Sequence, residues 1–261
     1  MENIGFIGLG NMGSKMCLHL VKAGCQVSGF DIDEKLISDL ANDGIKKTNS
    51  ISDVSRNKDI IITMLPDGNI VQDVLKEILD NVSNTPTIID CSTIDVKTSK
   101  KLYGLALSKK ISLLDAPVSG GTIGASNGTL TFMVGGDPST YDKVSNILNL
   151  MGSKSVYCGS SGSGQATKLC NNMLLATTMI GVSESFNMAK KLKLDLNVLY
   201  EVISTATGSC WAINNYCPIP NVGPQSPADN NFLPGFSAKL MSKDLKLAIK
   251  AAEESNSNIN L

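Results

Sequence analysis

The sequence contains a single histidine, His19, among its 261 residues. This scarcity argues against a catalytic triad built on histidine and against a metal site with several histidine ligands. Cysteine offers no substitute, because the seven cysteines are scattered and lack the close pairs of a metal-binding motif. An odd number of scattered cysteines is typical of reduced thiols in an intracellular compartment. We therefore expect neither a bound metal nor disulfides.

The chain also lacks an excess of charge of one sign and any long apolar run. It carries 23 basic and 24 acidic residues, for a net charge of -1, and no basic stripe. Nucleic acids and anionic membranes are therefore not expected partners. No apolar run approaches the ~20 residues that a membrane span requires. With 42% apolar residues, the chain can nevertheless bury a substantial core.

The first half of the chain alternates short β-branched runs with segments of helical period. The strand-like runs are residues 3–8, 26–30, 59–64, 87–90 and 111–115. The helical segments between them are residues 11–23, 33–43, 68–80 and 96–109. Two further strands are expected at 129–135 and 153–157, with Asp137 and Pro138 as the N-cap and first residue of a helix between them. This alternation predicts βαβ units in a doubly wound, mainly parallel sheet of the α/β class.

The pattern changes near Gly162. Residues 164 to about 192 contain no proline and predict one long helix, roughly 40 Å at 1.5 Å per residue. A helix capped by Asp195, a Pro/Asn-rich loop over 213–235 and a last helix over 237–254 follow. We therefore expect two domains, residues 1–163 and an all-α C-terminal domain at 164–261, entered through the long interdomain helix.

A glycine-rich turn follows the first strand and opens a helix. It reads Gly8-Leu9-Gly10-Asn11-Met12-Gly13. The first glycine permits a tight turn, the second lets backbone approach a pyrophosphate, and the third lets helix and strand pack closely. The helix N-terminus then offers free N–H groups to phosphates. This context predicts a Rossmann-type domain that binds a dinucleotide, although a glycine turn without a ligand has the same local sequence.

Asp31 ends the second strand, 23 residues after Gly8. A carboxylate there can accept hydrogen bonds from both ribose hydroxyls and repels a 2′-phosphate, which favours NAD over NADP. Leu65-Pro66 and Ser92-Thr93 follow two other strands at the same sheet edge, where ligands of open α/β sheets bind. We predict cofactor contacts from Leu65, Pro66 and Thr93; ordinary loop and capping roles explain these residues equally well.

Two segments offer groups for chemistry. Ser119, Gly120 and Gly121 follow a strand and expose N–H groups and a hydroxyl, which suits a carboxylate, although a plain turn also fits. Lys168 and Asn172 are four residues apart and share a helical face with apolar neighbours. Lost solvation there should lower the pKa of Lys168 toward neutrality, so that the amine can take a proton from an alcohol. The alternative is a lysine that reaches solvent from the helix edge.

Four motifs resemble the 3-hydroxyisobutyrate dehydrogenase family of the β-hydroxyacid dehydrogenases, over nearly the whole chain. They are GFIGLGNMG at 5–13, DAPVSGG at 115–121, GSGQATKLCNN at 162–172 and FSAKLMSKDL at 236–245. The resemblance implies that Lys168 is the catalytic lysine and Asn172 its partner. It further implies that the Ser119–Gly121 segment binds the substrate carboxylate, that Asp31 contacts the ribose and that Lys243 lies near the nicotinamide. From the residues alone, Lys243 fits a surface lysine equally well.

The reaction that the resemblance implies is oxidation of (S)-3-hydroxyisobutyrate to methylmalonate semialdehyde with NAD, a step of valine catabolism. It also implies a homodimer or homotetramer, in the mitochondrial matrix of a eukaryote or otherwise in the cytoplasm; no transit segment is evident at the start of this sequence. The family continues for a few helical turns beyond its last motif, whereas this chain stops at Leu261. We therefore expect the C-terminal domain to be truncated.

Other functions fit the same residues. One alternative keeps the chemistry and changes the substrate, as in tartronate or succinic semialdehyde reductases, which often prefer NADP and carry basic residues after the second strand. Asp31 and Asp33 stand there instead. The other alternative is a non-catalytic dinucleotide-binding module, in which the catalytic lysine is typically lost. Lys168 is present, which favours the enzyme.

Overall fold

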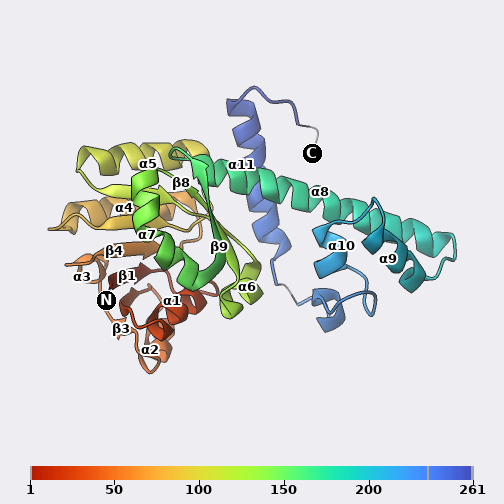
Figure 1. Ribbon diagram of the computed structural model, residues 1–261, viewed down its shortest axis with the longest axis horizontal. Coiled ribbons are helices and arrows are strands. Elements are labelled where there is room, and N and C mark those ends of the chain that lie inside the picture. The colour runs from red at the N-terminus through yellow and green to blue at the C-terminus, as the bar shows by residue number, and fades with distance from the viewer. Residues whose placement is uncertain (1, 234, 260–261) are drawn as a thin grey trace. The chain divides into compact units, whose positions relative to one another are not determined.

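The computed structural model describes residues 2–233 and 235–259 (Figure 1). Its contacts divide the chain into two compact units, Met1–Lys168 and Leu169–Leu261. The division falls inside the long helix α8 (Ser163–Lys191). The sequence predicts a domain boundary at the start of this helix, between residues 163 and 164, and this boundary stays a prediction.

One mostly parallel sheet forms the centre of the first unit. Its strands are β1 (Asn3–Ile7), β2 (Gln26–Phe30), β3 (Lys46–Lys47), β4 (Ile60–Thr63), β5 (Thr87–Asp90), β6 (Ser112–Asp115), β7 (Val118–Ser119), β8 (Leu130–Gly135) and β9 (Gly152–Gly159). Their order is β3-β2-β1-β4-β5-β6-β8-β7, with β9 paired to β8. Strands β1 to β6 are mutually parallel, whereas β8 is antiparallel to β6 and β7. The order 3-2-1-4-5-6 of the first six is that of a Rossmann-type sheet, which confirms the predicted fold class.

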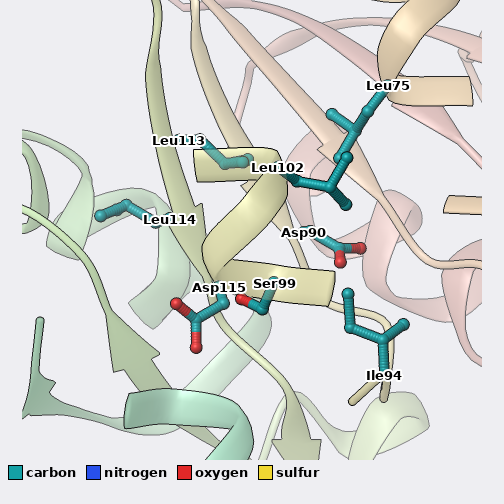
Figure 2. A pocket seen from close by; sticks show the side chains of 8 residues that line it. All are labelled: Leu75, Asp90, Ile94, Ser99, Leu102, Leu113, Leu114 and Asp115. Atoms are coloured by element: carbon teal, nitrogen blue, oxygen red, sulfur yellow. The ribbon is translucent and has the colours of Figure 1, made fainter. Parts of the chain in front are cut away.

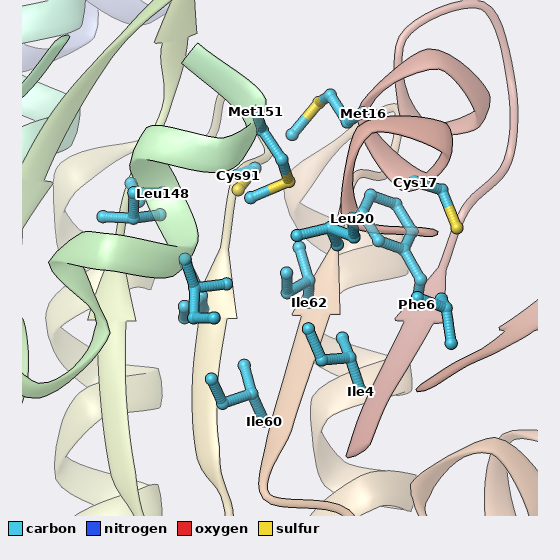
Figure 3. Close-up of a cluster of buried hydrophobic side chains, with 14 of the residues drawn as sticks. Ile4, Phe6, Met16, Cys17, Leu20, Ile60, Ile62, Cys91, Leu148 and Met151 are labelled. Carbon is cyan, nitrogen blue, oxygen red and sulfur yellow. The ribbon is translucent and has the colours of Figure 1, made fainter. Parts of the chain in front are cut away.

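Helices cover both faces of this sheet. They are α1 (Gly13–Lys22), α2 (Glu34–Ala41), α3 (Ile51–Ser55), α4 (Gly68–Asn81), α5 (Val96–Ser108), α6 (Gly121–Asn127) and α7 (Pro138–Met151). Side chains of α1 and α7 pack on one face, in the cluster that Figure 3 shows, and those of α3, α4 and α5 pack on the other. Along β4, Ile60 and Ile62 join the first cluster and Ile61 joins the second. The short apolar strands therefore supply two cores at once, as expected of strands buried on both faces.

The predicted strands and helices of the first unit are confirmed to within two residues at each end. Asp137 caps α7 and Pro138 stands in its first turn, as predicted. Four short elements were not predicted, namely β3, α3, β7 and α6. None is longer than seven residues, and so short a segment carries too little periodicity to be recognised.

Among the described residues, the second unit consists of helices joined by loops, without strands. It holds the remainder of α8, then α9 (Leu196–Thr205), α10 (Trp211–Tyr216), the 3-10 helix η1 (Pro227–Asn230) and α11 (Ala238–Glu254). The predicted long helix is confirmed, and Asp195 caps α9 as expected. No helix among the described residues is both long and apolar enough to cross a membrane.

The prediction of a Pro/Asn-rich loop over 213–235 is wrong for two parts of that range, which are helical. Helix α10 extends into it and buries Ala212 and Ile213, and η1 forms within it. Pro227 starts η1 rather than breaking it, because the first position of a helix needs no N–H donor. Ser226 and Asp229 cap that helix reciprocally. The proline content that indicated a loop therefore belongs partly to a helix start.

A buried acid joins the carboxyl end of the sheet to the start of α8. Asp115, at the end of β6, accepts hydrogen bonds from the backbone N–H of Gly162 (2.7 Å) and of Gln165 (3.0 Å). The carboxylate packs so closely that Gly135 has no room for a side chain, because a Cβ atom on it would stand 2.7 Å from an Asp115 oxygen. Burial raises the pKa of Asp115, and these backbone donors oppose that rise. The carboxylate therefore fixes where α8 begins.

Asp90, at the end of the neighbouring strand β5, is only 3% exposed. Its carboxylate accepts hydrogen bonds from Thr63 Oγ1 (2.8 Å) and from the backbone N–H of Ser92 (3.1 Å). Burial raises the pKa of Asp90 to about 6, and the charge of Asp115 contributes to the rise. Figure 2 shows both acids lining a small cavity of about 10 Å³. Asp90 is thus a buried group that titrates at mildly acidic pH.

This raised pKa predicts a pH-dependent stability. Between the usual aspartate pKa of about 3.9 and the folded value, the folded state binds more protons than the unfolded state, so stability falls as pH rises through that window. Asp90→Asn removes this titration. Relative to the wild type, the variant should gain about 1–3 kcal/mol in the free energy of unfolding between about pH 4 and about pH 7.

Urea unfolding at several pH values measures this difference. Asp39→Asn, an exposed position on α2, is the matched control and should leave the pH profile unchanged. Parallel profiles for the wild type and Asp90→Asn would contradict the raised pKa.

Candidate active site

The glycine-rich turn between β1 and α1 contains two glycines that the fold itself requires. Gly8 has a φ of 93°, and a side chain on it would collide with the carbonyl oxygen of Met64. A side chain on Gly13 would collide with the carbonyl oxygen of Gly8. Gly10 differs, because no atom lies within 4 Å of the position of its missing Cβ. The protein therefore leaves open space over the second glycine, where a pyrophosphate must come close to backbone.

Asp31 lies directly beside this turn. Its Oδ2 accepts a hydrogen bond from the backbone N–H of Leu9 (2.6 Å), and its Oδ1 accepts one from that of Asp33 (3.0 Å). Asn11 is exposed and Met12 is half-buried at the start of α1. A carboxylate at the end of β2, an open backbone and a helix N-terminus form the set of groups that holds the ribose and phosphates of a dinucleotide. The residues present thus fit a nicotinamide dinucleotide.

The ends of β4 and β5 are joined at the same edge of the sheet. The backbone N–H of Leu65 donates to Ser92 Oγ at 2.9 Å. Pro66 is exposed, and Thr93 is half-buried next to Ser92. Parallel strands in one sheet place their carboxyl ends at one edge, so Leu65, Pro66 and Thr93 belong to the edge that carries the glycine turn.

The predicted carboxylate loop lies between β7 and α6. Ser119 ends β7 and is paired with Thr131 of β8. Gly120 and Gly121 have φ values of 131° and 61°, and no atom lies within 4 Å of the Cβ position of Gly121. Residues with side chains rarely adopt such angles. The loop therefore presents open backbone beside a half-buried hydroxyl, as an anion-binding loop requires.

Helix α1 supports this loop from behind. His19 Nε2 lies 3.0 Å from the carbonyl oxygen of Ala125 and 3.1 Å from that of Ser126, in the last turn of α6. Lys15 Nζ donates to the carbonyl oxygen of Thr122 at 3.4 Å. Lys15 and His19 are four residues apart and so share one face of α1. Sequence analysis assigned neither a role; their spacing was visible, but their partners more than 100 residues away were not.

Lys168 lies in the second turn of α8 and is 7% exposed. Gln165, three residues earlier and on the same helical face, is fully buried. Its Nε2 donates to the carbonyl oxygen of Ser92 (2.8 Å), and its Oε1 accepts from the backbone N–H of Ile94 (3.1 Å). Lys168 therefore stands on the face of α8 that packs against the loop after β5. Gln165 and Asp115 both lie within the recognised motifs, but the sequence did not indicate the contacts that they make.

Asn172 and Lys243 belong to the second unit, where both contact Asp244. Asn172 Nδ2 donates to Asp244 Oδ2 at 2.6 Å, and Lys243 Nζ lies 3.6 Å from Asp244 Oδ1. Asn172 and Asp244 are 2% and 3% exposed. The buried Asp244 thus links α8 to α11, and sequence analysis missed it. Within the part of the chain that the structure describes, no group of three or more His, Cys, Asp or Glu residues could hold a metal ion.

Family models cover nearly the whole chain. Residues 3–159 match the NAD binding domain of 6-phosphogluconate dehydrogenase, and residues 162–261 match a family described as NAD-binding of NADP-dependent 3-hydroxyisobutyrate dehydrogenase. These two ranges meet at the start of α8, after the glycine turn and the carboxylate loop.

Individual relatives agree with the family models. The mitochondrial 3-hydroxyisobutyrate dehydrogenase of Drosophila melanogaster is 46% identical over 261 residues, which are 100% of this chain and 81% of that protein. The NAD-dependent L-serine dehydrogenase of Pseudomonas aeruginosa is 38% identical, over 99% of this chain and 88% of that protein.

A solved structure extends the likeness to the fold. Mycobacterium tuberculosis 3-hydroxyisobutyrate dehydrogenase, determined with L-serine, superposes with a TM-score of 0.95 at 44% identity, over 99% of this chain and 89% of that one. Full-length identity at this level, together with an open glycine turn that fits a nicotinamide dinucleotide, leads to one assignment. The chain belongs to the 3-hydroxyisobutyrate dehydrogenase family of nicotinamide-dependent oxidoreductases.

Proposed function

We propose that this protein oxidises (S)-3-hydroxyisobutyrate to methylmalonate semialdehyde with NAD, a step of valine catabolism, and that Lys168 is its general acid and base. The observation that carries the proposal is the burial of Lys168 on the face of α8 that packs against the loop after β5. Lysine is almost never buried without a functional or structural partner. The substrate is assigned from the names of the relatives, and the cofactor from the open glycine turn.

The described residues divide the work between binding and chemistry. In this proposal Ser119, Gly120 and Gly121 hold the substrate carboxylate through N–H groups and a hydroxyl. When bound, the nicotinamide would supply the acceptor for the hydride. The residues assigned to that cofactor are Gly8, Leu9, Gly10, Asn11, Met12, Gly13, Asp31, Leu65, Pro66, Thr93 and Lys243.

Lys168 acts on the proton. Its neutral amine takes the proton of the substrate hydroxyl as hydride leaves the carbon that carries this hydroxyl. In the reverse reaction the ammonium returns the proton to the oxygen. Asn172 is proposed as its partner, one helical turn further along α8. Its hydrogen bond to Asp244 Oδ2 holds the Asn172 amide in a fixed orientation. Oxidation therefore requires the uncharged lysine and should slow as pH falls.

NAD is proposed over NADP because of the acid beside the turn. Asp31 already accepts the Leu9 N–H, so its carboxylate is held in place without a ligand. A fixed carboxylate there accepts hydrogen bonds from the ribose hydroxyls and repels a 2′-phosphate. Asp33, two residues later, adds further negative charge to this position.

L-serine is a second candidate substrate, favoured by a relative named for its oxidation and by a related structure determined with it. L-serine and 3-hydroxyisobutyrate share a carboxylate and a primary alcohol at C3, and they differ in the amino or methyl group at C2. The same loop and the same lysine serve both. Tartronate and succinic semialdehydes remain alternatives for the reverse direction.

The setting follows the relatives as well. We propose a homodimer or homotetramer. It would work in the mitochondrial matrix if the source is a eukaryote, and otherwise in the cytoplasm; the Drosophila relative is named as mitochondrial.

The substrate assignment predicts a clear preference. One methylene in an apolar pocket is worth about 1–3 kcal/mol, and placing the ammonium of L-serine where a methyl group fits adds a desolvation cost. The value of kcat/KM for (S)-3-hydroxyisobutyrate with NAD should therefore exceed that for L-serine by at least about 10-fold. Steady-state oxidation of both substrates, alongside reduction of tartronate and succinic semialdehydes with NADH and NADPH, measures it. A higher value for L-serine would move the assignment to a serine dehydrogenase, and NADPH-dependent reduction would move it to a semialdehyde reductase.

Removal of the proposed base should slow turnover strongly. Lys168→Ala should lower kcat by roughly 10²- to 10⁴-fold, the usual contribution of general acid–base catalysis. Lys168→Arg should be equally slow because a guanidinium does not lose its proton. In the wild type, kcat/KM for oxidation should fall with decreasing pH, as the amine becomes protonated.

NADH fluorescence titration verifies that the Lys168 variants still bind cofactor. Lys190→Ala, an exposed lysine on the same helix, is the control and should keep wild-type activity. Full turnover by a folded Lys168→Ala variant would exclude the lysine as the acid and base.

Asp31 should set the choice of cofactor. Asp31→Ser removes a charged acceptor and the repulsion of a 2′-phosphate, so the ratio of kcat/KM for NAD to that for NADP should fall by roughly 10- to 100-fold. Asp39→Ser on the exposed face of α2 serves as the control. An unchanged ratio would mean that another residue discriminates between the cofactors.

A further inference from the structure

A polar hollow of about 370 Å³ lies on the flank of the first unit, away from the groups assigned above. Residues of β1, β2, β3 and α3 and of the segment after α3 line it; these elements carry red to orange colours in Figure 1. Its basic side chains are Lys46, Lys47, Arg56 and Lys58, and its only acidic one among the described residues is Asp53. Four basic side chains against one acidic one give the lining an excess of positive charge, which Glu34 beside Lys47 and Asp59 next to Lys58 offset only in part.

The deepest of these charges is Lys58, which is 6% exposed. Its Nζ donates to Asn3 Oδ1 and to Ser28 Oγ, both at 2.7 Å. An ammonium carries three N–H donors, and both of these partners are neutral. Burial lowers the pKa of Lys58, and the charge of Lys46 lowers it further, while Asp59 opposes the shift. Asp59 thus offsets only part of the cost of burying this ammonium, so a further negative charge close to Lys58 would stabilise it.

The rim can supply further donors. Arg56 lies 3.7 Å from Asp53, and Lys47 lies 3.7 Å from Glu34; both pairs are largely solvent-exposed. Exposed pairs of this kind contribute little energy and separate readily. A guanidinium, several ammonium groups, hydroxyls and amides are the donors that proteins use for multiply charged oxyanions.

The Lys58 end of the hollow is separate from the cofactor edge, whereas its Lys47 and Thr48 end lies beside Gly29, two residues before Asp31. Asn3 begins β1, and the glycine-rich turn follows the other end of that strand. A strand of five residues spans roughly 13–17 Å at about 3.3 Å per residue. A molecule seated against Lys58 would therefore not occupy the place of the cofactor phosphates.

We propose that this hollow is a second binding site, which takes a small phosphate-bearing molecule with its phosphate against Lys58. The volume suits such a ligand, since small-molecule sites start at about 300 Å³. A phosphate brings about two negative charges and three acceptor oxygens, which match the excess of positive charge and the number of donors. A monocarboxylate would leave most of that charge uncompensated.

Calorimetric titration of the NADH-saturated enzyme tests the proposal, because saturation with NADH blocks the phosphate sites of the glycine turn. Inorganic phosphate and glycerol 3-phosphate are the probes, at an ionic strength held constant with sodium chloride. One saturable site should remain in the presence of NADH. Arg56→Gln and Lys46→Gln each remove one exposed donor and should weaken phosphate binding by about three- to tenfold, and the double variant by more.

Lys76→Gln on α4 is the control, since it removes an exposed lysine with an acid 3.7 Å away but lies outside the hollow; it should bind phosphate as the wild type does. Citrate separates a phosphate site from a general polyanion site. Absence of saturable phosphate binding to the NADH complex, unchanged affinity in the double variant, or binding of citrate without phosphate would each overturn the proposal.

Discussion

The arrangement of the candidate site depends on the buried carboxylate of Asp115 at the first turn of α8. Its oxygens take the N–H groups of Gly162 and Gln165, which a helix start otherwise leaves without partners. A negative charge at a helix N-terminus is also favoured by the helix dipole. Gln165 then joins α8 to the loop after β5. These contacts fix the first turn of α8 and therefore the position of Lys168, three residues after Gln165.

Local patterns were sufficient to predict the sheet, its long helices and the cofactor turn, because βαβ periodicity and the spacing of Gly8 and Asp31 are all contained within short segments. Contacts between distant segments were not predictable. Asp115 and Gln165 are 50 residues apart, and Asn172 and Asp244 are 72 apart. No period in a single sequence encodes such a pairing. The roles of Asp115, Gln165 and Asp244 therefore emerge only from the folded chain, even though each residue lies in or beside a recognisable motif.

Family and substrate rest on different parts of the molecule. The fold is shared with the Mycobacterium tuberculosis relative, and the loop with Gly120 and Gly121 is proposed to bind the carboxylate that 3-hydroxyisobutyrate and L-serine have in common. Only the small group at C2 distinguishes these acids, and backbone N–H groups do not recognise it. Discrimination must come from side chains around that carbon, which explains how relatives with 38% and 46% identity to this chain carry names for different substrates.

Helix α1 has two tasks at once. It begins at the glycine turn, and His19 and Lys15 on its side contact carbonyl oxygens of α6, the helix that follows the loop at Gly120. A helix of this length behaves as a stiff rod. Any displacement of α1 would therefore move α6 together with the glycine turn, which couples the position of the proposed acid loop to that of the cofactor turn.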